Sequence, residues 1–116
     1  MYTTAPVKDV YELLDQESAF ASFHNWEGYA QSIDETRTDL NTFLARHPFH
    51  VVVKDWESQN DENEQAYQTD VAAYNWLDEE NISYETFEEA PLYDAGITVL
   101  GFPSEKAATL FKLHWT

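Results

Sequence analysis

The sequence predicts an α+β fold in which a three-stranded mixed sheet is covered by helices. Three segments, residues 49–56, 82–87 and 97–102, are rich in β-branched and aromatic residues and lack a helical period. Four other segments repeat apolar residues every three to four positions, as amphipathic helices do. The predicted order is α-α-β-α-β-β-α. The 116 residues fit a single domain, residues 1–116.

The first predicted helix is short. Pro6 precedes it, and proline is tolerated in a first helical turn. Its apolar face follows the i, i+3, i+4, i+7 pattern, with Val7, Val10, Tyr11 and Leu14. Residues 18–31 are less regular. Their aromatic residues belong either to a short helix or to a loop that folds them back onto the core; they are Phe20, Phe23, Trp26 and Tyr29.

The second predicted helix begins at a capping box, the S-x-x-E pattern formed by Ser32 and Glu35. Pro48 ends it, because the residue before a proline avoids helical backbone angles. A third helix is predicted over residues 64–80, with Asn81 as its stop. The apolar faces of these two helices carry Ile33, Leu40, Phe43 and Leu44, and Tyr67, Val71, Tyr74 and Leu77.

The strands are expected to pair through a crossover. The first strand, the third helix and the second strand predict a right-handed connection between parallel neighbours. The third strand is expected to pair antiparallel with the second. Ser104 then caps a last helix, whose predicted apolar face carries Ala107, Leu110, Phe111 and His114.

The composition excludes several classes of protein. Asp and Glu number 22 against 6 Lys and Arg, so the formal charge is −16. Such a charge argues against direct binding of nucleic acid and of anionic membranes. The absence of cysteine excludes disulfides and thiolate chemistry. No signal peptide or membrane-length apolar run is recognised, so a cytoplasmic protein is expected.

The acidic residues are unevenly spread. Residues 55–94 contain thirteen Asp or Glu and no Lys or Arg. One interpretation is a solvated face or adaptation to a saline environment. The other is a surface that binds a basic protein, with an exposed tryptophan as anchor. The candidate partner-binding residues are Asp55, Glu57, Asp61, Glu62, Glu64, Asp70, Trp76, Asp78, Glu79, Glu80, Glu85, Glu88 and Glu89.

No catalytic, cofactor-binding or metal-binding residue is predicted. The sequence lacks a nucleophile elbow, a phosphate-binding loop and a dinucleotide fingerprint. His47 and His50 flank Pro48, and with a carboxylate they could bind a metal, but surface or capping histidines are far commoner. A calcium loop starting at Asp55 fails, because its sixth position is Asn60 and its twelfth is Ala66.

The C-terminal residues 101–115 end in an A-x-x-F-K-L-x-W helix, formed by Ala108, Phe111, Lys112, Leu113 and Trp115. This segment resembles the C-termini of small uncharacterised tailed-phage proteins. The resemblance implies a phage origin, and hence the host cytoplasm, but no activity. Because Ala108, Phe111 and Trp115 sit at helical spacing, they are expected to dock the last helix on the sheet. By composition alone, the chain is similar to acidic phage anti-defence proteins that mimic DNA.

Two functions are therefore expected. The first is a non-enzymatic inhibitor whose acidic face blocks a basic, nucleic-acid-binding site of a host protein. The alternative is a phage structural or assembly protein whose acidity serves solubility or saline adaptation. A homodimer is compatible with either.

Overall fold

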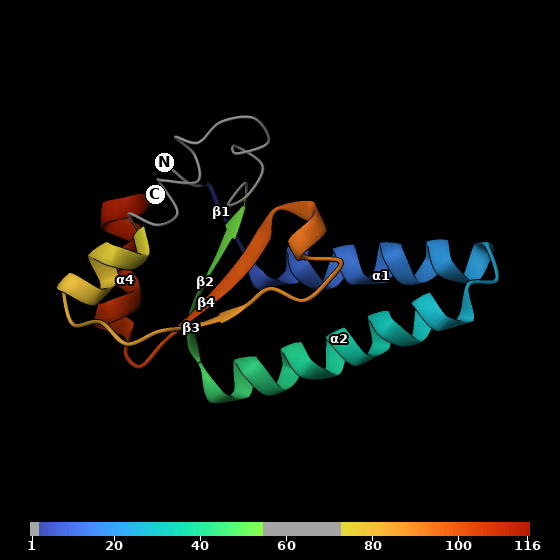
Figure 1. The fold of residues 1–116 in the computed structure, drawn as a ribbon, viewed down its shortest axis with the longest axis horizontal. Coiled ribbons are helices and arrows are strands. Elements are labelled where there is room, and N and C mark those ends of the chain that lie inside the picture. Colours follow the sequence, from blue (N-terminus) through green and yellow to red (C-terminus); the bar gives the residue numbers. More distant parts are fainter. Residues whose placement is uncertain (1–2, 55–72) are drawn as a thin grey trace.

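The computed structural model describes residues 3–54 and 73–116, and these residues form an α+β fold (Figure 1). The class predicted from the sequence is confirmed. Residues 73–79 form a helical segment between the second and third strands. The other elements, in chain order, are β1 (Thr3–Ala5), α1 (Val7–Phe23), α2 (Glu27–Arg46), β2 (Phe49–Lys54), β3 (Glu85–Phe87), the 3-10 helix η1 (Tyr93–Ala95), β4 (Ile97–Phe102) and α4 (Glu105–Trp115).

The sheet differs from the prediction in strand number and direction. It has four strands in the order β1-β2-β4-β3, and every neighbouring pair is antiparallel. The predicted crossover between parallel neighbours is wrong, because β4 lies between β2 and β3. These two strands do run in the same direction, since both are antiparallel to β4. The result is a split β-α-β arrangement.

The predicted element order is also wrong, because it lacks β1. Thr3, Thr4 and Ala5 pair with Lys54, Val53 and Val52 of β2 at one edge of the sheet. Three residues are too few to show the alternation by which a strand is recognised in a sequence. The strand exists because β2 offers it an unpaired edge.

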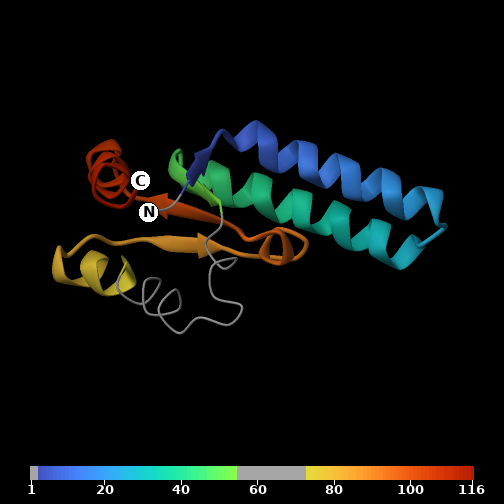
Figure 2. The same cartoon turned by 90° about the horizontal axis from the view of Figure 1, so that it is seen from above.

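Helices cover both faces of the sheet, and the alternation along β2 separates the two layers (Figure 2). Val52 packs with α1 and α2 in one buried cluster, together with Val99 of β4. Val51 and Val53 pack in the other cluster, with α4 and the segment 73–79. All six residues of β4 are buried, as expected of a central strand covered on both faces.

The two N-terminal helices form a hairpin that extends beyond the sheet (Figure 1). Both are longer than predicted. Residues 18–31 belong mostly to α1 and α2, and Ser32 lies inside α2 instead of capping it. Of the aromatic residues of this region, Tyr29 is half-buried and packs against the core cluster of α1 and α2. Phe20, Phe23 and Trp26 are exposed at the far end of the hairpin.

Three helical segments end in the same way. The chain turns through a residue with left-handed backbone angles, which is Asn25, Asn81 or Gly96. In each case the N–H of the next residue donates to the carbonyl five positions before it, at 2.8 to 2.9 Å. This is the Schellman arrangement, and it satisfies carbonyls that a helix end leaves open. The predicted stop at Asn81 is confirmed.

The last helix starts as predicted, because the Ser104 hydroxyl accepts the N–H of Ala107 at 3.2 Å. The expected docking through Ala108, Phe111 and Trp115 is confirmed, but the predicted apolar face through Leu110 and His114 is wrong. Leu110 and His114 are exposed, whereas Ala107, Ala108 and Phe111 are buried and Trp115 packs against them. Among the helices of residues 3–54 and 73–116, none is long and apolar enough to cross a membrane.

Candidate interaction surface

The predicted acidic surface is described only in part. Six of its residues lie outside the described ranges: Asp55, Glu57, Asp61, Glu62, Glu64 and Asp70. The same holds for residues 64–72 of the predicted third helix. The remaining candidates fall on two places, the end of the helical segment 73–79 and the strand β3 with the loop after it.

The first place carries three exposed carboxylates. Asp78, Glu79 and Glu80 follow one another where the segment 73–79 ends. Trp76, the predicted anchor, is half-buried. Its ring stacks on His114 with 4.5 Å between ring centroids and an interplanar angle of 14°. It also packs against the core cluster beneath α4, so the structure favours a packing role for Trp76 over that of an exposed anchor.

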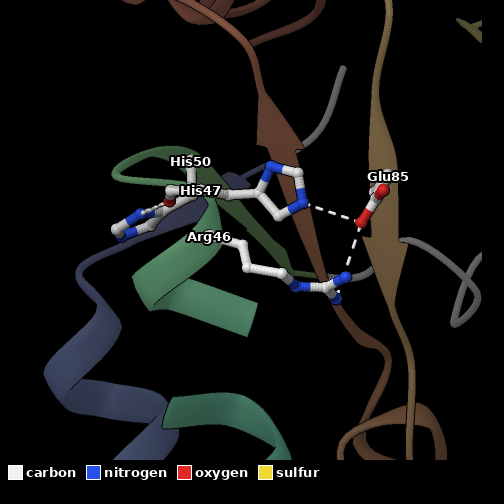
Figure 3. Close-up of polar contacts among 4 residues, drawn as sticks. All are labelled: Arg46, His47, His50 and Glu85. Carbon is white, nitrogen blue, oxygen red and sulfur yellow. Dashed lines mark hydrogen bonds and ion pairs between the residues drawn. The ribbon is translucent and has the colours of Figure 1, made fainter. Parts of the chain in front are cut away.

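The second place is the edge of the sheet. The strand β3 is an outer strand, and it lies beside the end of α2 (Figure 3). The His47 Nε2–H donates to the Glu85 carboxylate at 2.7 Å, and Arg46 approaches the same oxygen at 3.7 Å. The hydrogen bond from His47 is the main reason that the pKa of Glu85 lies below its ordinary value of 4.5.

The two histidines that flank Pro48 do not converge. The His50 Nδ1–H donates to the backbone carbonyl of His47 at 3.1 Å, and its ring points away from Glu85 (Figure 3). Within residues 3–54 and 73–116, no group of three His, Asp or Glu side chains is placed to hold a metal ion. The histidines therefore link α2 to the start of β2 and to β3.

In the loop that follows β3, Glu89 lies near carboxyl groups of α2. The carboxyl group of Glu89 interacts with that of Asp39 in α2, and Glu35 adds a like charge nearby. Partial burial, the interaction with Asp39 and the charge of Glu35 together raise the pKa of Glu89 above 4.5, and the nearby Thr36 opposes this shift. The Thr36 hydroxyl donates its proton to the carbonyl of Ala90 at 3.0 Å.

These carboxylates define an acidic edge surface along β3 and the adjoining side of α2. An open groove on α2 continues it, lined by Gln31, Asp34, Glu35, Thr38 and Asp39. Glu88 contributes from the loop and accepts a hydrogen bond from the Tyr74 hydroxyl at 3.3 Å. We use the term for six residues: Asp34, Glu35, Asp39, Glu85, Glu88 and Glu89.

Half of this surface was not predicted. Asp34, Glu35 and Asp39 are far in sequence from residues 55–94, and only the packing of α2 beside β3 joins the two groups. The sequence does contain a signal, since Gln31, Glu35 and Asp39 recur every four residues and so lie along one side of α2. That pattern indicates an acidic helix face but not the strand beside it.

In the described residues, these carboxylates lie along an exposed surface. The chain matches no protein-family model, and comparisons with curated proteins and with solved structures find no match.

Proposed function

We propose that this chain is a non-enzymatic binding protein that uses its acidic edge surface to block a basic, nucleic-acid-binding site of another protein. The resemblance of its C-terminal helix to tailed-phage proteins suggests a host protein as the partner, and defence against phage as the process blocked. The surface would act as a mimic of a nucleic-acid backbone.

The contact between Glu89 and Asp39 carries this proposal. The carboxyl groups of Glu89 and Asp39 interact near the surface, with Glu35 beside them. Burial is the main cause of the raised pKa of Glu89, and the two neighbouring carboxyl groups raise it further, so part of the shift is the free-energy cost of their repulsion. A surface that served only solubility would gain nothing from bringing like charges into contact. A partner that supplies Lys or Arg would offset the repulsion between these carboxylates. The free energy released in this way would strengthen binding of the partner.

The arrangement of the charges also suits a site built for phosphates. Glu35 and Asp39 are one helical turn apart, about 6 Å at 1.5 Å per residue. That is close to two steps of a DNA strand, at about 3.4 Å each. The neighbouring carboxylates on β3 and its loop widen this row into a surface that a groove lined with Lys and Arg could accept.

The test has two stages. Tagged protein is first used to isolate partners from bacterial lysate at low and at high salt. Each isolated partner is then mixed with labelled duplex DNA, and the chain is added in increasing amounts. We expect DNA to be displaced, with an apparent affinity that falls steeply as salt increases.

Matched variants assign the effect to the surface. Asp39→Asn combined with Glu89→Gln removes two charges from the acidic edge surface, and Asp9→Asn combined with Glu12→Gln removes two from α1. We expect the first pair to weaken displacement and the second to leave it nearly unchanged. A partner that binds DNA and the chain at the same time would contradict the proposal.

A second candidate is a phage structural or assembly protein. The exposed aromatic residues at the end of the α1–α2 hairpin favour it, since Phe23 is 83% exposed. Under this alternative the acidity serves solubility, and stability rises with salt. A monomer in solution that displaces DNA from its partner would decide against it.

A further inference from the structure

The turn between α1 and α2 carries a cluster of exposed aromatic rings. Phe20, Phe23 and Trp26 are 49%, 83% and 51% exposed. The His24 ring stacks on Trp26 with 4.9 Å between centroids and 26° between planes. Phe20 packs against both, at 4.4 and 5.5 Å. We call these four residues, together with Tyr29, the hairpin tip.

The backbone holds the hairpin tip in one arrangement. Only three residues separate the two helices, and Asn25 adopts the left-handed angles that allow so tight a turn. The Trp26 N–H donates to the carbonyl of Ala21 at 2.8 Å, and Ala21 is fully buried between the helices. Rings presented on a preorganised turn lose little conformational entropy on binding.

Exposure of large aromatic side chains to water is unfavourable, so the hairpin tip is a candidate docking surface. A cluster of large aromatic residues at the end of a projecting hairpin is unusual for a soluble surface. Tyrosine and tryptophan are also the residues that most often dominate binding energy in interfaces. Phe20, Phe23 and Trp26 belong to neither core cluster, whereas Tyr29 packs against the cluster of α1 and α2. The turn that carries these rings lies away from the sheet (Figure 1).

The acidic residues near the hairpin tip favour a basic binding partner. No Lys or Arg occurs between Lys8 and Arg37, and the acidic residues of this stretch nearest the turn in sequence are Glu17 and Glu27. Glu27 directly follows Trp26, and Glu17 accepts a hydrogen bond from the Tyr29 hydroxyl at 3.0 Å. A second copy, with its own charge of −16, would be repelled. A basic surface would be attracted.

We propose that the hairpin tip anchors arginine side chains of the partner. A guanidinium group stacks on aromatic faces and pairs with carboxylates in the same contact, which a lysine ammonium does less well. Phe23 and Trp26 provide the faces, and Glu17 and Glu27 provide the carboxylates. This inference rests on the proposed function, because it names the partner chemistry at a second part of the same interface.

The two parts lie on one helix. Glu27 at the hairpin tip and Glu35 and Asp39 of the acidic edge surface all belong to α2, and Glu27 and Asp39 are about 18 Å apart along the axis at 1.5 Å per residue. A basic partner can therefore contact both. The edge surface supplies charge attraction, and the hairpin tip adds selectivity for arginine.

The test compares two short peptides of equal length, one rich in arginine and one equally rich in lysine. Each is titrated into ¹⁵N-labelled protein at low salt, and amide shifts are followed by NMR. We expect the arginine peptide to shift residues 20–29 and to bind more tightly than the lysine peptide. Phe23→Ser should weaken arginine-peptide binding roughly fivefold to tenfold.

Leu113→Ser is the matched control. Leu113 is 77% exposed on α4, on the opposite side of the molecule from the hairpin tip (Figure 1). Both variants replace an exposed apolar side chain, so circular dichroism should show the fold unchanged in each. Leu113→Ser should leave the affinity of both peptides unchanged.

The outcomes separate this inference from the proposed function. Equal affinity for both peptides, with shifts confined to the acidic edge surface, would overturn the arginine anchor and leave the proposed function standing. No shift with either peptide would contradict both. A dimer in sedimentation that Phe23→Ser converts to monomer would assign the hairpin tip to contact between copies and overturn the inference.

Discussion

The imidazole ring of His47 lies against Gly101, so closely that a Cβ atom on this glycine would come within 2.5 Å of the His47 Cγ atom. Gly101 sits in β4 between His50 of β2 and Glu85 of β3. The space above the glycine lets the ring cross the central strand and reach Glu85. Because residue 101 is a glycine, the His47 ring can connect the end of α2 to Glu85 at the edge of the sheet.

Gly101→Ala should destabilise the protein. The new methyl group would push the His47 ring aside and break its 2.7 Å hydrogen bond to Glu85. Overpacking of this kind costs about 1–3 kcal/mol, which urea unfolding would measure. Gly28→Ala is the control with the opposite sign, because nothing lies within 4 Å of its Cβ position and alanine favours a helix. A second His47→Ala substitution should restore part of the loss, and no restoration would contradict this explanation.

Glu85→Gln should destabilise the protein in a pH-dependent way. The hydrogen bond from His47 lowers the pKa of Glu85 below 4.5, so the carboxylate favours the folded state wherever it is ionised. That contribution is present above pH 4.5 and disappears as the pH falls through the lowered value in the folded protein. Urea midpoints of the two proteins should therefore differ at neutral pH and converge in acid. A constant difference at all pH values would rule out ionisation of Glu85 as the cause.

Glu89→Gln should have the opposite effect. The pKa of Glu89 is raised, so its ionised form opposes folding at neutral pH. This cost shrinks as the pH falls through the raised value and is gone below 4.5. Solvent screens an exposed pair, so we expect a gain of about 0.2–1 kcal/mol at neutral pH that salt reduces. Glu79→Gln removes the same charge from an exposed helix end, and an equal gain there would point to net charge alone.

Asn25→Ala should loosen the turn that presents the hairpin tip. Asn25 has a φ of 58°, where a Cβ atom without a polar group is unfavourable by about 1–2 kcal/mol. Asn25→Gly accepts this conformation without strain and should be close to neutral. Thermal unfolding would compare the two variants, and hydrogen exchange of the Trp26 amide would report on the turn itself. Equal stability of both variants would show that the backbone angle does not limit this turn.

The sequence predicted elements with a strong local signal. Residues 97–102 form β4 as predicted, because an unbroken apolar run suits a strand covered on both faces. Ser104 caps α4 because a serine hydroxyl satisfies an open N–H of the first turn. The prediction that Ser32 caps the second helix is wrong, because Ser32 lies inside α2. Serine and glutamate three residues apart also occur inside helices, and only the length of the hairpin distinguishes the two cases.

Strand pairing and the acidic edge surface could not be predicted in the same way. Whether β4 lies beside β2 or beyond β3 depends on which faces the helices cover, and no short window of sequence contains that information. The contact of Asp39 with Glu89 depends on the same packing. The aromatic residues from Phe20 to Tyr29 were recognised as a group, but their position depends on how far α1 continues past the sheet.

The central position of β4 also determines when the sheet can form. Val51 of β2 pairs with Leu100 of β4, so the chain must be made almost to its last helix before the middle of the sheet closes. Until then one edge of β2 is open, and its valines have no neighbour on that side. Contacts so distant in sequence also slow folding. We therefore expect a chain that stops before Ile97 to aggregate through β2 instead of folding as a smaller domain.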